Sequence, residues 1–268
     1  MARGWYNKTD MDLNKQIDCF LLDLDGTVYL GSKLIDGVKE GIERMRNKNK
    51  RVIFLTNNSS TTKAHYVKKI SSLGIPVTMD DIYTSANATA DWIKENRKDC
   101  KPYIVATPET EKEFEENGIS SCNENPDTVI LTFDKTLDYS KLVRCCDLIA
   151  RGAEYIATHP DMVCPMENGS IPDVGSFINL IEGTTHRRPD VICGKPYKIM
   201  ADCISKKTGV PLGRTAMIGD RLSTDMKFAI DNGLVSVLTL SGEANMTEYE
   251  KSGLTVNKII NSVAEWDV

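Results

Sequence analysis

Short apolar runs alternate with helical stripes along most of this chain, and this alternation is the feature that most constrains its fold. Tyr66, Ile70 and Leu73 recur at the spacing of one helix face, and the stripe stops at Gly74. Alternation of this kind predicts an α/β fold in which helices cover both faces of a parallel sheet. The apolar runs that suit fully covered strands are residues 17–24, 51–55, 215–218 and 235–240.

The last part of the chain continues the pattern. Leu222, Met226 and Ala229 form a helical stripe that ends at Gly233. A final stripe predicts a helix that closes the chain, and its residues are Ile259, Val263 and Trp266.

The middle of the chain carries elements of its own, because strand-like runs and a helical stripe recur there between two loop-like segments. Such elements can enclose a separate small core. We therefore predict an inserted α/β domain over residues 81–187, with residues 1–80 and 188–268 forming one discontinuous core. The three strands of the insertion are expected at residues 103–106, 129–133 and 155–157.

Composition limits the class of protein. The 268 residues include 33 Lys+Arg against 38 Asp+Glu, a net charge of −5, and sequence-independent nucleic-acid binding needs a basic face instead. No apolar run approaches the ~20 residues that span a membrane, so neither nucleic acid nor membrane is an expected partner. Eight dispersed cysteines and a polar start predict a cytoplasmic protein with free thiols. The first sixteen residues fit a frayed and a packed extension equally.

Two carboxylates follow the first apolar run, in Leu22-Asp23-Leu24-Asp25-Gly26. Strand alternation puts Asp23 and Asp25 on one side, at the carboxyl end where open parallel sheets bind ligands. Adjacent acids require a cation, a shared proton or full solvation. A hydrated turn after an edge strand is the alternative reading of this pair taken alone.

Three further polar clusters follow predicted strands. The hydroxyl and amide run 56–60 precedes a helix, whose free backbone N–H groups can bind an anion. Plain N-capping is the alternative, and it is favoured for Ser60 and Thr61. The other two clusters are Cys193-Gly194-Lys195-Pro196 and Gly219-Asp220-Arg221, the latter followed by Asp225. Each alone is typical of a turn, but their common place at strand ends favours a single site.

Together the four clusters resemble the four motifs of the haloacid dehalogenase superfamily, most of whose members are Mg²⁺-dependent phosphatases. A narrower resemblance to the NagD-like, 4-nitrophenylphosphatase-type branch rests on the strings DLDGTVYLG, FLTNNSS, CGKP and GDRLSTD. The resemblance covers nearly the whole chain after residue 16. It implies a Rossmann-like parallel-sheet core with an α/β cap inserted between the second and third motifs, where the predicted domain 81–187 falls.

The resemblance also implies catalytic roles. Asp23 would be the nucleophile that forms an aspartyl-phosphate, and Asp25 would protonate the leaving oxygen and then activate water. Lys195 would add positive charge to the phosphoryl oxygens. The residues that would hold those oxygens are Thr56, Asn57 and Asn58.

A magnesium site is implied by the same motifs. Mg²⁺ would be held by Asp23, the backbone carbonyl of Asp25 and the side chain of Asp220, with Asp225 as a second acid that orients the site. Four ionised aspartates against Lys195 leave a charge of about −3, which repels a phosphate dianion. Mg²⁺ and one proton on Asp25 bring the site near neutrality.

Two loops of the predicted cap depart from the pattern of the branch. The stretch 172–175 carries Asp173 where a Pro-Gly-x-Gly-like loop has glycine, and the stretch 157–161 carries His159 within an Ala-Thr-Asn-Pro-Asp-like run. If the loops reach the cleft, His159 and Asp173 bind hydroxyls or an amine of the substrate. Ordinary surface-loop residues are the alternative.

The sequence thus predicts a Mg²⁺-dependent phosphatase that hydrolyses small phosphate monoesters such as a sugar phosphate, a nucleotide or a similar metabolite. A broad cap should exclude phosphoproteins and nucleic-acid chains. A phosphomutase on the same scaffold and a non-enzymatic metabolite sensor or phospho-acceptor are the alternatives. The sequence leaves the oligomeric state open, a homo-oligomer included.

Overall fold

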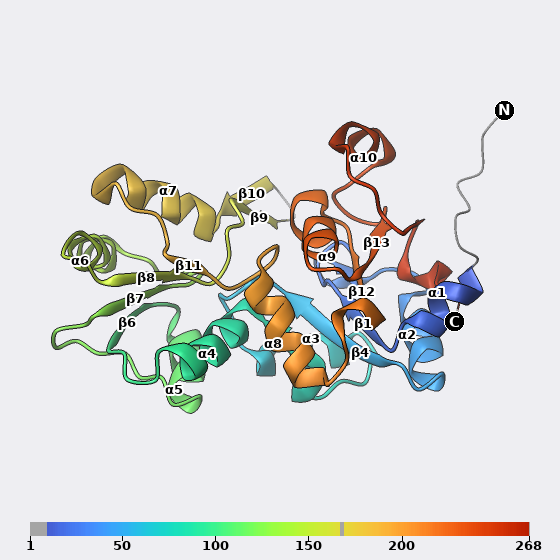
Figure 1. Ribbon diagram of the computed structural model, residues 1–268, viewed down its shortest axis with the longest axis horizontal. Helices are drawn as coiled ribbons and strands as arrows, with labels where there is room; N and C mark the ends of the chain where they lie inside the picture. The colour runs from blue at the N-terminus through green and yellow to red at the C-terminus, as the bar shows by residue number, and fades with distance from the viewer. Residues whose placement is uncertain (1–9, 167–168, 268) are drawn as a thin grey trace. The chain divides into compact units, whose positions relative to one another are not determined.

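The computed structural model of the chain describes residues 10–166 and 169–267 (Figure 1). These residues form two compact units. The first unit contains the residues up to 55, residues 73–75 and the residues from 205 onward, and the second contains residues 56–72 and 76–204. Both units have a parallel sheet with helices, which confirms the predicted α/β class.

The first unit is built on a parallel sheet whose strands follow the order β14-β13-β12-β1-β4. Every residue of β1 is buried, as expected for a central strand covered on both faces. The strands are β1 (Cys19–Leu22), β4 (Arg51–Thr56), β12 (Thr215–Gly219), β13 (Val235–Thr239) and β14 (Lys258–Ile260).

The register of β1 places the first carboxylate cluster just beyond the strand. Leu22 lies opposite Ile218 of β12, and the Asp23 N–H donates to the Ile218 carbonyl at 2.9 Å. The strand ends there because Gly26, at φ 87°, turns the chain and donates its N–H to the Tyr29 carbonyl at 2.8 Å. The sequence predicts a strand that runs to residue 24, but β1 ends at Leu22, so Asp23 belongs to the following loop.

The predicted closing helix is wrong. The segment forms the edge strand β14 and a single 3₁₀ turn, η4 (Val263–Glu265). Its apolar residues are buried in different ways: Ile260 in the edge strand, and Trp266 edge-on against Phe20 with ring centroids 5.4 Å apart. A spacing that imitates a helix face thus arises from a strand, a turn and an aromatic contact.

The remaining elements of the first unit surround the sheet. Residues 10–16 form a helix in which Leu13 is buried, so this part of the N-terminal extension is packed, while residues 1–9 lie outside the described residues. The elements are α1 (Asp10–Gln16), β2 (Tyr29–Leu30), β3 (Lys33–Leu34), α2 (Val38–Asn47), η2 (Leu212–Arg214), η3 (Leu222–Met226), α9 (Lys227–Asp231) and α10 (Met246–Ser252).

The second unit has its own parallel sheet, in the order β11-β8-β7-β6 (Figure 1). Helices α6 and α7 pack together on one face, and α4 and α5 lie on the other. The three predicted strands of the middle region are confirmed with small shifts in their ends. The sheet strands and these helices are α4 (Ser85–Asn96), β6 (Pro102–Val105), α5 (Pro108–Glu116), β7 (Thr128–Leu131), α6 (Tyr139–Ala150), β8 (Glu154–Ala157), α7 (Val174–Thr185) and β11 (Val191–Ile192).

The strand before Lys195, β11, was expected in the same sheet as the other strands that precede a motif, but it lies in the sheet of the second unit. Val191 lies opposite Ile156 of β8, so the turn that carries Lys195 follows a strand of the second sheet. The two residues of β11 are only half-buried, in keeping with an edge strand. The other elements of the second unit are α3 (Lys63–Ser72), η1 (Met79–Asp81), β5 (Ile82–Thr84), β9 (Val163–Met166) and β10 (Gly169–Pro172), and α8 (Lys198–Thr208) begins in it.

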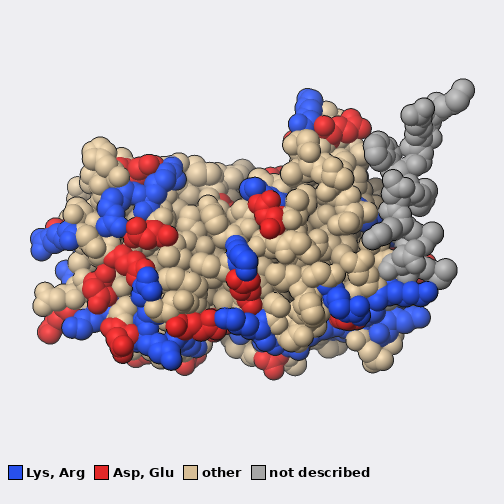
Figure 2. All heavy atoms as spheres, in the orientation of Figure 1, with Lys and Arg blue, Asp and Glu red and all other residues tan. Residues whose placement is uncertain are grey.

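The surface carries charges of both signs. On the face drawn in Figure 2, lysines and arginines are interspersed with aspartates and glutamates. Several are paired, such as Arg97 with Glu154 at 2.7 Å and Arg187 with Asp190 at 2.8 Å. All eight cysteines are free thiols. Among the described residues, no helix has both the length and the apolar character needed to cross a membrane.

Candidate active site

Three carboxylates of the first unit converge from separate segments of the chain. Asp23, Asp220 and Asp225 each offer an oxygen, and these oxygens lie within 4.8 Å of one another. Asp220 and Asp225 are buried and Asp23 is half-buried, whereas Asp25 is exposed. The parallel register explains the meeting, because Asp23 and Asp220 follow the neighbouring strands β1 and β12 at the same sheet edge.

Glycines make the space that these carboxylates occupy. A Cβ on Gly26 would lie 2.1 Å from Asp220 Oδ2, and one on Gly242 would lie 2.0 Å from the same atom. A Cβ on Gly219 would lie 2.4 Å from the Asp225 carboxyl carbon. The sequence did not single out Gly242, whose only local signal is its place shortly after β13.

Within the cluster, Asp220 is the carboxylate whose charged form is disfavoured. Its Oδ2 accepts the Glu243 N–H at 2.7 Å, while its buried Oδ1 has no hydrogen-bond partner among the described residues. Burial first, and then the charge of Asp225, raises the pKa of Asp220 to about 7. An orphaned buried oxygen beside two further carboxylates is a hard, anionic donor set, so the residues fit a divalent cation such as Mg²⁺.

Asn57 and Lys195 meet in the second unit. The Asn57 Nδ2 donates to the Lys195 carbonyl and the Lys195 N–H donates to Asn57 Oδ1, each at 2.9 Å. The same Nδ2 faces both carboxylate oxygens of Asp161 at 3.2 Å. One amide thus fixes the backbone of the Gly-Lys-Pro turn. Asp161 was missed as a candidate, although it stands in the same short run as His159.

The loop after β4 is shaped by its own polar side chains. The Asn58 N–H donates to Thr56 Oγ1 at 3.1 Å, and the Ser60 N–H and hydroxyl both donate to Asn58 Oδ1. Helix α3 begins only at Lys63, and Thr62 accepts the His65 N–H at 3.3 Å. The capping roles favoured for Ser60 and Thr61 are therefore wrong, because the helix starts later than the hydroxyl run suggested.

His159 and Asp173 are buried and not surface-loop residues. The His159 Nε2 lies 2.9 Å from Asp173 Oδ1, which also accepts the Val174 N–H at 2.7 Å as the N-cap of α7. Their two loops pack closely, since a Cβ on Gly175 would lie 2.3 Å from the Pro160 carbonyl oxygen.

Gly194→Ala is expected to lower kcat/KM on a phosphate ester by about 10²-fold, the order of loss that a displacement of about 1 Å can cause. The added Cβ would lie 2.6 Å from the Thr158 carbonyl oxygen and 2.7 Å from Asn57 Oδ1, so Asn57 or the Lys195 turn must shift. Steady-state kinetics measures the loss. Gly183→Ala is the matched control, because nothing lies within 4 Å of its Cβ. Equal kinetic constants for both variants would contradict the prediction.

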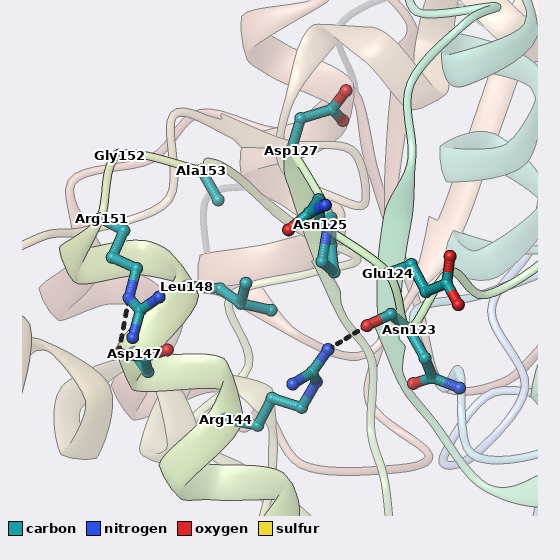
Figure 3. Close-up of a pocket in the computed structure, with 11 residues that line it drawn as sticks. Asn123, Glu124, Asn125, Asp127, Arg144, Asp147, Leu148, Arg151, Gly152 and Ala153 are labelled. Carbon is teal, nitrogen blue, oxygen red and sulfur yellow. Dashed lines mark hydrogen bonds and ion pairs between the residues drawn. The ribbon is translucent and has the colours of Figure 1, made fainter.

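A separate cavity of about 610 Å³ lies in the second unit, lined by the loop 123–127, by α6 and by the turn after it (Figure 3). Arg144 donates to the Asn123 carbonyl at 2.6 Å, and Arg151 pairs with Asp147 at 2.9 Å. None of the residues that the sequence predicts for the site lines this cavity.

Comparison with known proteins identifies the class. The family model described as haloacid dehalogenase-like hydrolase matches residues 20–120, and a second model, HAD-hydrolase-like, matches residues 192–266. The 5′-nucleotidase YutF of Bacillus subtilis is 31% identical over 92% of this chain and 96% of its own length. The sugar-phosphatase AraL of the same organism is 30% identical over 85% of each chain. This chain belongs to the haloacid dehalogenase-like hydrolases.

Solved structures narrow the assignment within that class. The 4-nitrophenylphosphatase of Thermotoga maritima is 42% identical, with a TM-score of 0.92 over 94% of this chain and 97% of its own. Other structural neighbours are NagD proteins, which confirms the NagD-like branch that the motifs indicated. The chain is accordingly a phosphoric monoester hydrolase.

Proposed function

We propose that this protein is a Mg²⁺-dependent phosphatase that hydrolyses small phosphate monoesters through an aspartyl-phosphate intermediate. The observation that carries the proposal is the convergence of Asp23, Asp220 and Asp225, with one orphaned buried oxygen on Asp220. In this proposal the carboxylates of the first unit and the Asn57–Lys195 pair of the second act on the same phosphoryl group.

The residues divide the chemistry among them. Asp23 attacks phosphorus, and Asp25 donates a proton to the leaving oxygen and afterwards takes one from water. The exposure of Asp25 supports this role, because its carboxyl can reach a leaving group. Phosphoryl oxygens are held by Thr56, Asn57 and Asn58, with charge from Lys195.

The cation belongs to the carboxylate cluster. Asp23, the Asp25 carbonyl and Asp220 hold it, and Asp225 orients the set. When bound, Mg²⁺ supplies the charge that lets a phosphate dianion approach three carboxylates. The close glycine contacts around Asp220 support this role, since they leave its oxygens little freedom to turn away.

The substrate is proposed to be a small phosphorylated metabolite, a sugar phosphate or a nucleotide. Relatives named as a 5′-nucleotidase and a sugar-phosphatase support this range. Residues 81–187, which include His159 and Asp173, are proposed as the cap that selects the substrate. The free thiols of all eight cysteines support a reducing compartment, the cytoplasm.

The test is release of inorganic phosphate from 4-nitrophenyl phosphate, sugar phosphates, nucleotides, phosphoglycolate and pyridoxal phosphate, with Mg²⁺ and with excess chelator. We expect release on at least one substrate with Mg²⁺ and none with chelator. Transfer to a second sugar hydroxyl without free phosphate would favour a phosphomutase. Binding without turnover on every substrate would favour a sensor.

A further inference from the structure

A buried chain of hydrogen bonds runs from the start of α7 to the loop after β4. Asp173 Oδ1 lies 2.9 Å from His159 Nε2, and His159 Nδ1 lies 3.3 Å from Ser85 Oγ. The Ser85 hydroxyl donates to the carbonyl of Asn57. All four residues are buried, so water does not compete for these contacts.

A second branch leaves the same histidine. His159 Nδ1 lies 3.1 Å from Thr158 Oγ1, which lies 2.9 Å from Ser59 Oγ. Ser59 Oγ accepts the Phe133 N–H at 2.9 Å, and the Ser59 carbonyl accepts from Thr110 at 3.0 Å. The loop is thus held at Asn57 and at Ser59.

We propose that His159 and Asp173 are a positioning pair for the phosphoryl-binding loop: they hold Asn57 and, through its amide, the backbone of Lys195. This deepens the proposed function and rests on it. The amide of Asn57 transmits the restraint, because it bonds both the N–H and the carbonyl of Lys195 at 2.9 Å. The pair links the loop after β8 and the start of α7 to the groups that are proposed to hold phosphate.

The chemistry of the pair suits positioning. The Ser85 hydroxyl gives its proton to the Asn57 carbonyl, so Ser85 Oγ can only accept a hydrogen bond, from His159 Nδ1. His159 Nε2 donates to Asp173 Oδ1, so the chain of hydrogen bonds is complete when both ring nitrogens carry a proton. A group that contacts substrate needs a free polar atom, whereas a buried charged group that is fully hydrogen-bonded fixes the geometry around it. His159, Asp161 and Asp173 are also near enough to hold a metal, but both ring nitrogens of His159, both carboxylate oxygens of Asp161 and Oδ1 of Asp173 already take part in hydrogen bonds.

Two substitutions of His159 interrupt the series of hydrogen bonds between Asp173 and Asn57 at different points. His159→Gln keeps an amide near the Nε2 position and loses the contacts to Ser85 and Thr158, while His159→Asn keeps those contacts and loses Asp173. Each is expected to lower kcat/KM on 4-nitrophenyl phosphate by about 10–100-fold and to raise the inhibition constant of inorganic phosphate.

The control is Tyr83→Phe in the same unit, which removes the hydroxyl that donates to Asp91 at 2.8 Å in a partly buried hydrogen bond. It should lower the melting temperature and leave the kinetic constants unchanged. Circular dichroism shows which variants fold, and either His159 variant suffices for the test.

The proposal is overturned if the His159 variants keep wild-type kinetic constants and phosphate inhibition while only their melting temperatures fall. It is also overturned if activity falls only on hydroxyl-rich substrates and phosphate inhibition is unchanged, because that result indicates direct substrate contact. If wild type released no phosphate at all, the proposed function would fail. The affinity for inorganic phosphate, measured by calorimetry on the same variants, would then still decide the role of the pair.

Discussion

Replacing Asp23 by asparagine is expected to lower kcat for phosphate release by at least about 10³-fold, in line with the loss of an enzyme's nucleophile. An amide oxygen cannot form the bond to phosphorus that the proposed mechanism assigns to the carboxylate. The exchange also removes one of the three carboxylates that lie within 4.8 Å of one another. The fold should persist, because the backbone N–H of residue 23 still donates to the Ile218 carbonyl.

Two measurements separate these effects. Single-turnover reaction with 4-nitrophenyl phosphate reports the chemical step, and acid quenching should trap a phosphorylated protein in wild type alone. Asp231→Asn is the matched control, because it removes an exposed carboxylate of the same unit that pairs with Lys227, one turn earlier, at 2.7 Å. More than about 1% of wild-type kcat in the Asp23 variant would exclude Asp23 as the nucleophile.

The carboxylate cluster could be predicted from the sequence because its cause is simple. Parallel strands end at one edge, so acids that directly follow the neighbouring strands β1 and β12 must approach each other. Buried apolar runs identify such strands well. The same rule assigned the strand before Lys195 to the wrong sheet, since nothing local shows that Val191 and Ile192 pair with β8.

Contacts between distant segments were beyond reach of any pattern. Position 242 requires glycine because any Cβ there would collide with Asp220 Oδ2, and the two residues are brought together only by the fold. His159 and Asp173 were proposed one by one as substrate contacts, but their 2.9 Å bond to each other depends on the packing of two loops. Local chemistry predicts which groups matter, whereas tertiary packing decides what they touch.

Asp220→Asn is expected to have opposite effects on activity and on stability. Turnover with Mg²⁺ should fall by about 10²–10³-fold, because the cation loses a carboxylate ligand. The metal-free protein should become more stable at pH 8, by about 4 kcal/mol in free energy of unfolding, because a buried carboxylate beside Asp225 is replaced by a neutral amide. The amide oxygen can still accept the Glu243 N–H.

The pH dependence identifies the cause. Asp220 has a pKa of about 7 in the folded protein and about 3.9 when unfolded, so folding favours its protonated form. Wild type without metal should therefore lose stability between pH 4 and 7 relative to the variant, and the difference should vanish near pH 4. Urea unfolding in chelator at pH 4, 6 and 8 measures it.

Adding Mg²⁺ at pH 8 should reverse the order of stability. A cation at 10⁴ times its dissociation constant stabilises wild type by about 5.5 kcal/mol, which exceeds the difference between the metal-free proteins, and the variant binds it weakly. Equal stability of the two metal-free proteins at pH 8 would mean that Asp220 is relieved by some group other than a cation. Buried carboxylates that lie close together destabilise the metal-free fold, and a bound cation would offset that cost. A reversal of the order of stability on adding Mg²⁺ is therefore the expected thermodynamic evidence for a cation site at Asp220.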